Sequence, residues 1–297
     1  MANEPYILSA ESTVDLPYEY MKSRNIPVAF YTYAINGTIY EDNMERDPEA
    51  EKYFYDQIDA GNIPSTSQIS YGAYYEYLES LLKENNVIHL CFGTGMTGSY
   101  NNAVQAAEEL REQYPDRKLY VIDTLCSCGG YGLITDDAAD MRDAGMSIDE
   151  LNDWVLSRRL IYHHEFFNAD LSYFKRTGRM SGPAATIASV LDIVPSMHLN
   201  IEGRIIAYGK VRGLKKELKH IIDEMTKHAE NGKDYSGKCF INHARNEETA
   251  LLLKEMLRET FQNLTDIRIY KIGSIITAHC GPGTISMYYY GDERIPD

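Results

Sequence analysis

The sequence lacks the features that would place a protein in a membrane or outside the cell. No run of 18 apolar residues occurs among its 297 residues, so no membrane-spanning helix is predicted. Its first residues, Met1 to Pro5, show no basic stretch followed by an apolar core, which a secretory signal requires. The five cysteines are odd in number, and the pair Cys126 and Cys128 does not have the redox C-x-x-C spacing. We therefore expect reduced thiols and a cytoplasmic location.

Positive charge is also scarce. The chain has 29 Lys and Arg residues against 44 Asp and Glu residues, which gives a formal net charge of -15. Nucleic acids and anionic lipid surfaces are usually bound through a dense basic face. We expect no nucleic-acid partner and at most transient membrane contact. Two short basic groups remain, one around Arg176 and Arg179 and one around Arg212, and each is either a solvated chain segment or a local anion contact.

The motifs of several enzyme classes are missing as well. The glycine-rich segment from Gly93 to Tyr100 has neither the lysine of a P-loop nor the spacing of a dinucleotide-binding loop, and the chain has no G-x-S-x-G elbow. His163 and His164 are adjacent on a predicted helix, where they would point away from each other, and no other pair has metal-ligand spacing. We predict no metal site and no cofactor.

The composition that is present, with 44% hydrophobic and 25% charged residues, is ordinary for a soluble globular protein. Short apolar runs alternate with longer amphipathic ones in the first part, which is the pattern of parallel strands joined by crossover helices. We predict a doubly wound α/β domain over residues 1–163. Its strands are expected at 6–10, 27–35, 87–92 and 119–123, and its helices at 17–24, 48–60, 71–84, 100–114, 129–144 and 148–163.

Beyond residue 163 the pattern changes to hairpin strands interspersed with two helices. We predict an α+β domain over residues 164–297, packed tightly on the first with a ligand cleft between them, because no flexible linker separates the two. Its strands are expected at 197–201, 204–211, 239–242, 267–272 and 284–290, and its helices at 213–230 and 247–262.

Three loops rich in hydroxyl groups and glycine lie at predicted strand ends or helix starts of the first domain. They run from Glu11 to Asp15, from Pro64 to Gln68 and from Gly93 to Tyr100. The carboxyl ends of the strands in such a sheet form a ligand crevice, so these loops are expected to converge. In the third loop, Thr97 is a candidate N-cap, and the free N–H groups of the following helix would suit a carboxylate or a phosphate.

A histidine near the end of the chain completes this set. The run from Ile272 is predicted to be a hydrophobic strand that carries His279 into a glycine-proline turn. Hydroxyl groups and an imidazole together can form a neutral cradle for a carboxylate. The alternative is a serine hydrolase in which Ser99 or Thr97 acts with His279, although no acid stands out to orient the histidine.

In this order and spacing, these segments resemble the DegV family, the bacterial fatty-acid-binding proteins also called FakB, over essentially the whole chain. The matching segments are Ser12-Thr13-Val14-Asp15-Leu16, Thr66-Ser67-Gln68, Met96-Thr97-Gly98-Ser99-Tyr100, Tyr173-Phe174-Lys175-Arg176-Thr177-Gly178-Arg179, Gly203-Arg204-Ile205 and Ile272-Gly273 through His279 to Gly281-Pro282-Gly283.

The resemblance implies that the protein binds one long-chain fatty acid between its two domains, with the acyl tail in an apolar tunnel. The carboxylate would be held by Thr66, by the turn Thr97-Gly98-Ser99 and by His279. Members of the family present the bound acid to a separate ATP-dependent kinase subunit of the DhaL type, which forms an acyl phosphate. The chain would then be a carrier without catalytic residues and with no cofactor other than its bound ligand.

The resemblance also suggests roles for three arginines. Arg179, Arg176 and Arg212 are candidates for contacting the phosphate or facing the kinase. Val194 and Leu214 stand where the family frequently has basic residues. This departure weakens the expectation of a kinase interaction more than the expectation of ligand binding.

A second alternative follows from the fold that the family shares with dihydroxyacetone kinases. On this hypothesis the chain is a substrate-binding subunit for a small carbonyl compound, which His279 would bond covalently. The apolar stretch 184–191 is a candidate wall of the acyl tunnel, although such helices more often belong to the core.

Overall fold

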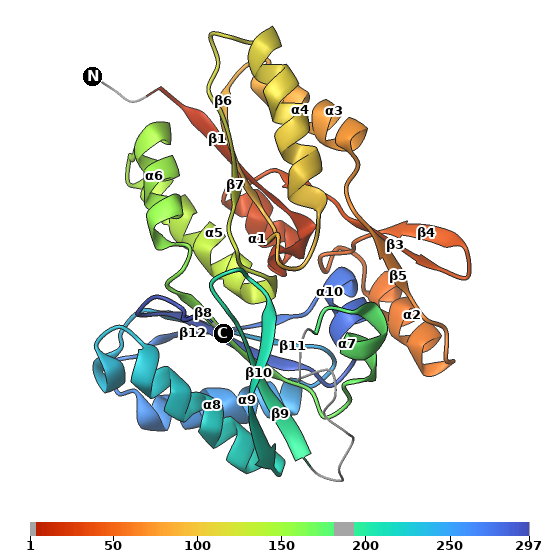
Figure 1. The fold of residues 1–297 in the computed structure, drawn as a ribbon, viewed down its shortest axis with the longest axis vertical. Coiled ribbons are helices and arrows are strands. Elements are labelled where there is room, and N and C mark those ends of the chain that lie inside the picture. The colour runs from red at the N-terminus through yellow and green to blue at the C-terminus, as the bar shows by residue number, and fades with distance from the viewer. Residues whose placement is uncertain (1–3, 181–192, 297) are drawn as a thin grey trace.

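The computed structural model describes residues 4–180 and 193–296 (Figure 1). The candidate tunnel wall at 184–191 lies outside the described residues. The strands are β1 (Tyr6–Glu11), β2 (Val28–Ala29), β3 (Thr32–Ile35), β4 (Thr38–Glu41), β5 (Ser65–Ser67), β6 (Asn86–Cys91), β7 (Leu119–Asp123), β8 (Tyr162–Phe167), β9 (Ile193–Leu199), β10 (Ile205–Arg212), β11 (Lys238–His243), β12 (Asp266–Lys271) and β13 (Ile285–Tyr290). The α-helices are α1 (Tyr18–Ser23), α2 (Pro48–Asp59), α3 (Tyr71–Leu82), α4 (Ser99–Gln113), α5 (Cys128–Asp143), α6 (Ile148–Arg158), α7 (Ser172–Thr177), α8 (Leu214–His228), α9 (Glu247–Thr260) and α10 (Ser274–Cys280).

The first sheet is parallel and has the strand order β2-β1-β6-β7. Its central strand β6 is buried along its whole length, as expected for a parallel strand that is covered on both faces. Val87 points toward a cluster with α3 and α4, whereas Ile88 and Leu90 belong to a cluster that includes α5 and α6. This arrangement confirms the predicted doubly wound α/β layer.

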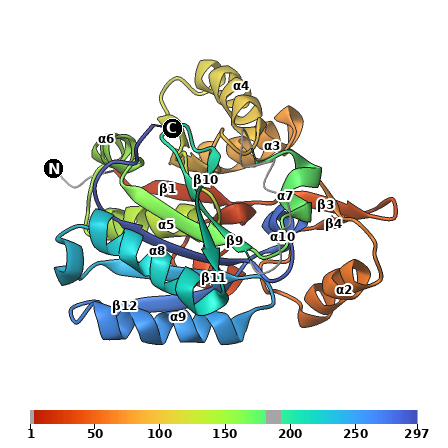
Figure 2. The same cartoon turned by 60° about the horizontal axis from the view of Figure 1, so that its bottom comes forward.

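The second sheet is mixed, with the order β10-β9-β8-β13-β11-β12. One face packs against the apolar sides of α8 and α9, through residues such as Leu218, Ile222 and Leu253. Figure 2 shows these two helices beneath the sheet and α5 on its other side. Val194 is buried in this second core.

Helix α5 lies between the two sheets and is buried on all sides from Cys128 to Ala139. A helix that is enclosed in this way needs small residues where atoms of a neighbouring segment come close. A Cβ atom on Gly132 would stand 2.5 Å from the carbonyl oxygen of Val14, and one on Gly130 would stand 2.2 Å from His164 Nε2. The glycines of α5 therefore bring the start of the chain and strand β8 close to one helix.

A third, antiparallel sheet of three short strands has the order β4-β3-β5 and projects from the side of the molecule (Figure 1). In it, Tyr33 of β3 pairs with Thr66 of β5. The sequence predicted a single strand over 27–35, but the structure has two short strands, β2 and β3, with Phe30 and Tyr31 between them. Each short strand pairs within a different sheet, which explains the break.

Two further predictions of local structure are wrong. The predicted helix over 148–163 ends at Arg158, and both His163 and His164 lie on strand β8. The predicted hydrophobic strand that carries His279 is a helix, α10, which begins after Gly273. His279 therefore lies in the last turn of a helix. The glycine-proline turn follows it as expected, with Gly281 at a φ of 80°.

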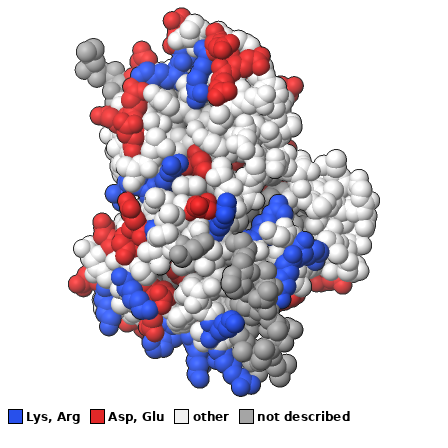
Figure 3. Space-filling view, in the orientation of Figure 1, with Lys and Arg blue, Asp and Glu red and all other residues white. Residues whose placement is uncertain are grey.

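None of the helices in the described ranges combines the length and the apolar character that crossing a bilayer demands. On the face shown in Figure 3, basic and acidic side chains are interspersed and do not form one continuous basic surface.

Candidate functional site

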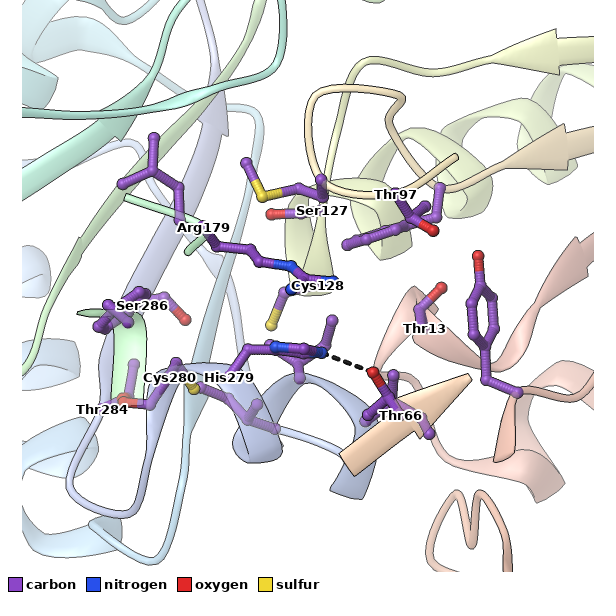
Figure 4. A pocket seen from close by; sticks show the side chains of 18 of the residues that line it. Thr13, Thr66, Thr97, Ser127, Cys128, Arg179, His279, Cys280, Thr284 and Ser286 are labelled. Carbon is purple, nitrogen blue, oxygen red and sulfur yellow. Dashed lines mark hydrogen bonds between the residues drawn. The ribbon is translucent and has the colours of Figure 1, made fainter. Parts of the chain in front are cut away.

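A cavity of about 100 Å³ lies between the carboxyl-terminal side of the first sheet and the second sheet (Figure 4). One part of its lining is apolar and the other part carries hydroxyl, amide, imidazole and guanidinium groups. The apolar lining residues are Phe92, Met96, Phe166, Phe174, Ile205, Ile272, Ile275 and Ile276, together with the ring of Tyr288. The polar lining residues include Thr13, Tyr31, Thr66, Ser67, Gln68, Thr97, Ser127, Arg179, His279, Thr284 and Ser286.

Two of the predicted site residues are in direct contact in this cavity, although 213 positions separate them. Thr66 Oγ1 and His279 Nε2 are 2.7 Å apart, and Figure 4 shows this hydrogen bond at the edge of strand β5. His279 Nδ1 is buried and has no hydrogen-bond partner among the described residues. Burial, with the nearby charges of Arg179 and Arg176, lowers the pKa of His279 to about 4. The imidazole is therefore neutral at pH 7, and one of its nitrogens is free to bind a ligand.

The turn Thr97-Gly98-Ser99 contributes differently from what the resemblance implies. Thr97 lines the cavity, whereas Gly98 and Ser99 do not. Ser99 is fully buried behind the cavity wall, where its Oγ accepts a hydrogen bond of 3.2 Å from the backbone N–H of Ile69. The sequence suggested Thr97 as the N-cap of α4, but the N-cap is Gly98. Thr97 Oγ1 still accepts a hydrogen bond of 3.2 Å from the backbone N–H of Ser99.

Two lining residues that the sequence did not single out carry buried polar atoms. Thr13 Oγ1 is buried and has no hydrogen-bond partner within residues 4–180 and 193–296. The Tyr31 hydroxyl is buried near the hydroxyl groups of Thr97 and Ser99, but it forms no hydrogen bond of good geometry with any group in the same ranges. Burial raises the pKa of Tyr31 well above its usual value, so the hydroxyl keeps its proton. Thr13 lies in the first hydroxyl-rich loop, and that signal could have identified it. Tyr31 is one of 24 tyrosines and follows no motif.

The three arginines are not equivalent. Arg179 lines the cavity, and its guanidinium donates to the carbonyl oxygen of Thr177. Arg176 is exposed and lies over the ring of Tyr173, with 4.4 Å between the guanidinium carbon and the ring centre. Arg212 is exposed at the end of β10 and does not line the cavity. Only Arg179 thus adds its charge to the wall of the cavity itself.

The geometry does not assemble a hydrolytic triad from the residues considered above. Ser99 Oγ is engaged by Ile69 and Tyr74, and His279 Nε2 is hydrogen-bonded to Thr66. No carboxylate in the described part of the chain binds His279 Nδ1, which would have to be oriented by an acid.

Acidic, histidine or cysteine groups come within metal-binding range of one another at two places in the described ranges, and neither place lines the cavity. Glu11, His89 and Cys91 meet in the first core. At the second place, which comprises Asp136, Asp137 and Asp140, the ammonium group of Lys238 already lies within 2.8 Å of each carboxylate.

The fold and the cavity define a two-sheet α/β protein with an apolar cavity that carries neutral hydrogen-bonding groups. The chain belongs to the DegV family, because the model of that family, whose members are described as uncharacterised proteins, matches residues 8–292. A DegV domain-containing protein of Clostridium perfringens is 35% identical over 98% of this chain and 99% of its own length.

Similarity also extends to Thermotoga maritima. A relative from this organism that is named a fatty acid-binding protein is 30% identical over 93% of this chain and 94% of its own length. A solved structure from the same organism, which is reported to reveal a fatty acid binding function, superimposes with a TM-score of 0.82 at 28% identity. The match covers 97% of this chain and 100% of the chain in that structure.

Proposed function

We propose that this protein binds one long-chain fatty acid in the cavity between its two sheets and presents the carboxyl group to an ATP-dependent fatty acid kinase subunit. The observation that carries the proposal is the set of buried polar atoms without partners in a largely apolar cavity, namely Thr13 Oγ1, the Tyr31 hydroxyl and His279 Nδ1. Buried polar groups are almost always hydrogen-bonded, so three such atoms around one cavity point to a ligand that accepts or donates there.

The energetics fit a fatty acid. Burying an acyl chain contributes about 0.8 kcal/mol per methylene group, whereas burying its carboxylate without partners would cost several kcal/mol. Hydrogen bonds from Thr13, Tyr31, Thr97 and His279 Nδ1 would offset that cost. Thr66 would act through His279, because its hydroxyl donates to Nε2 and so keeps the imidazole proton on Nδ1. Arg179 at the cavity wall adds a positive charge near the same end. The relatives from Thermotoga maritima that are named for fatty acid binding support the same ligand class.

Replacing His279 by alanine is expected to weaken fatty acid binding about tenfold to a hundredfold, because a hydrogen bond to a charged group contributes about 1.5 to 3 kcal/mol. Thr66→Val removes the partner of His279 and is expected to act in the same direction. Native mass spectrometry of the purified protein, followed by extraction and identification of the lipid, gives the ligand. Titration of delipidated protein with that acid then gives the affinities.

Thr260→Val serves as the matched control for this experiment. Thr260 lies on α9, where its hydroxyl donates to the carbonyl oxygen of Met256, and it does not line the cavity. This variant should bind the acid as the parent protein does. Full affinity in both His279→Ala and Thr66→Val would place the carboxylate elsewhere, and the absence of any lipid after purification and titration would remove the proposal.

The second half of the proposal concerns the kinase. With the fatty acid loaded, the kinase subunit and ATP are expected to give an acyl phosphate that hydroxylamine traps as a hydroxamate. Omitting either the kinase or this protein should abolish the product. Product formation by this protein and ATP alone would contradict its assignment as a carrier, and failure with an active kinase would restrict the function to lipid binding.

A further inference from the structure

Three side chains of types that bind metal ions meet in the core of the first sheet, outside the fatty acid cavity. They are Glu11 of β1 and His89 and Cys91 of β6, and the ligand atoms that they offer all lie within 4.8 Å of one another. Strands β1 and β6 are neighbours, with Ser9 paired to His89. Residues two apart on a strand point to the same face of the sheet. No spacing in the sequence indicates this set, because only the fold brings the two strands together.

His89 has an unused nitrogen at this place. Its side chain is completely buried, and its Nδ1 lies 2.8 Å from the hydroxyl oxygen of Ser9. Its Nε2 is also buried and has no hydrogen-bond partner within the segments that the structure describes. Glu11 Oε1 lies 3.7 Å from this nitrogen, which is too far for a hydrogen bond. Buried polar atoms are almost always paired, so the nitrogen points to a group that the surrounding side chains do not supply.

The distances suit one tetrahedral ion. Zn²⁺ lies about 2.0 to 2.3 Å from its nitrogen, oxygen and sulfur ligands, so the ligand atoms of a tetrahedral site are about 3.3 to 3.6 Å apart. The 3.7 Å between His89 Nε2 and Glu11 Oε1 is already close to that spacing. Cys91 Sγ is at most 4.8 Å from either atom, so a shift of about 1 Å brings it into bonding range. An ion bonded directly to three ligands requires no water-sized cavity.

Neighbouring groups hold two of these ligands in place. The hydroxyl group of Ser9 at Nδ1 leaves Nε2 of His89 as the nitrogen that faces Glu11. The backbone N–H of Phe92 donates to Glu11 Oε2 at 2.9 Å, so Oε1 is the oxygen turned toward the histidine. Contacts of this kind orient the ligands in metal sites. Phe92 lines the fatty acid cavity, so an ion here would lie behind the wall of that cavity.

The charges favour a divalent cation. Burial, and next the charge of Glu11, raises the pKa of the Cys91 thiol well above its usual value, so without an ion the sulfur keeps its proton. A bound ion would release this proton to water and bind the thiolate. The thiolate and the Glu11 carboxylate then carry two negative charges, which a divalent ion cancels. A set of groups with no net charge avoids the cost of burying an uncompensated ion.

We propose that Glu11 Oε1, His89 Nε2 and Cys91 Sγ bind one Zn²⁺ ion, which joins β1 to β6 in the folded protein. Mg²⁺ and Ca²⁺ take oxygen ligands, whereas a set of sulfur, nitrogen and oxygen suits Zn²⁺. The hydroxyl group of Tyr74 contacts Glu11 Oε1 and is placed to complete the tetrahedron. Because all three ligands are completely buried, the ion would have a structural role.

The test uses the full-length protein, produced in cells grown with added zinc chloride so that the ion is available while the chain folds. After purification and dialysis against buffer without metal, elemental analysis is expected to find one zinc ion per chain. Cys91→Ala and His89→Gln are each expected to retain less than a tenth of that zinc. Cys239→Ala is the matched control, because Cys239 is a buried cysteine of β11 in the second core, and it should retain all of it.

Zinc in the parent protein and in Cys239→Ala, together with its loss from Cys91→Ala and His89→Gln, supports the site. A parent protein without zinc, or zinc contents that agree within twofold between the parent protein and Cys91→Ala, would overturn it. If neither variant folds, crystals of the zinc-loaded parent protein decide. An anomalous peak at the zinc edge between His89 and Cys91 then supports the proposal, and its absence contradicts it. Fatty acid binding is measured separately and does not bear on this result.

Discussion

Replacing Lys238 by methionine is expected to lower the free energy of unfolding by about 3 kcal/mol, which is the lower end of the range for breaking a buried ion pair. The Lys238 ammonium lies 2.5 Å from Asp136 Oδ2, 2.8 Å from Asp137 Oδ1 and 2.5 Å from Asp140 Oδ2. The side chain of Asp136 is completely buried. Without the lysine, three neighbouring carboxylates would repel one another in an environment that solvates them poorly.

The expected loss stays near the lower end because Asp136 keeps two other partners. Arg24 Nη1 lies 3.1 Å from its Oδ1, and Arg268 Nη1 lies 3.3 Å from its Oδ2. Arg24 is the C-cap of α1 and Arg268 lies on β12, whereas the aspartates belong to α5 and Lys238 to β11. The network therefore joins the helices of the first sheet to the strands of the second, and its loss should destabilise both together.

Urea denaturation of the Lys238→Met variant, followed by circular dichroism, measures this effect. Lys219→Met is the control, since Lys219 pairs with Asp223 on the exposed side of α8 and such pairs contribute little. Equal midpoints for Lys238→Met and the parent protein would show that the arginines alone hold the three carboxylates.

The parts of the fold that the sequence predicts best are those in which burial and local pattern agree. Strand β6 is apolar from Val87 to Cys91 except for His89, and the parallel sheet buries it on both faces. Burial and local pattern also agree in helices α3 and α4, because their apolar residues repeat with the period of a helix and pack on that strand.

Prediction from the sequence failed where tertiary contacts override the local preference for helix or strand. The run Ile275-Ile276-Thr277 is rich in β-branched residues and favours a strand, yet it forms helix α10. Ile275 packs in the core of the small sheet, and Thr277 is fully buried. Helix α10 also contacts β3, β5 and α7, and these contacts set the position of His279.

In the candidate site, too, the local sequence pattern predicts some features and tertiary contacts decide the others. The hydroxyl-rich loops predicted which segments approach the ligand, since chain segments at the carboxyl edge of a parallel sheet converge. The pattern could not indicate which hydroxyl turns inward. Ser99 points into the core because Tyr74 of α3 lies against its Oγ at 3.2 Å, and Tyr31 enters the cavity because the chain breaks between β2 and β3. Both outcomes depend on neighbours that are distant in the sequence.

Asp42 gives the second large expected effect, which depends on pH. This residue follows strand β4 and is completely buried, and burial raises the pKa of its carboxyl group from 3.8 to about 6. The folded state therefore binds its proton more tightly than the unfolded state does. The resulting stabilisation is fully present below pH 3.8 and is lost as the pH rises through 6.

A difference of about two pKa units corresponds to about 3 kcal/mol, and about 2 kcal/mol of that falls between pH 4.5 and pH 7.5. Asp42→Asn keeps a neutral group of the same size and does not titrate. Relative to the parent protein, the variant is therefore expected to gain about 2 kcal/mol in unfolding free energy across this interval. Asp15 acts in the same direction, because the charge of Asp42 adds to the burial that raises the pKa of Asp15.

Denaturation curves at several pH values for both proteins measure this difference, and the contributions of titrating groups that do not interact with Asp42 cancel in the comparison. Asp223→Asn on the exposed side of α8 is the control, and its stability should follow that of the parent protein at every pH. If the curves for Asp42→Asn also ran parallel to those of the parent protein, the carboxyl group of Asp42 would titrate alike in the folded and unfolded chains. Its burial would then impose no cost on the charged form, and a positively charged group would have to compensate the buried carboxylate of Asp42.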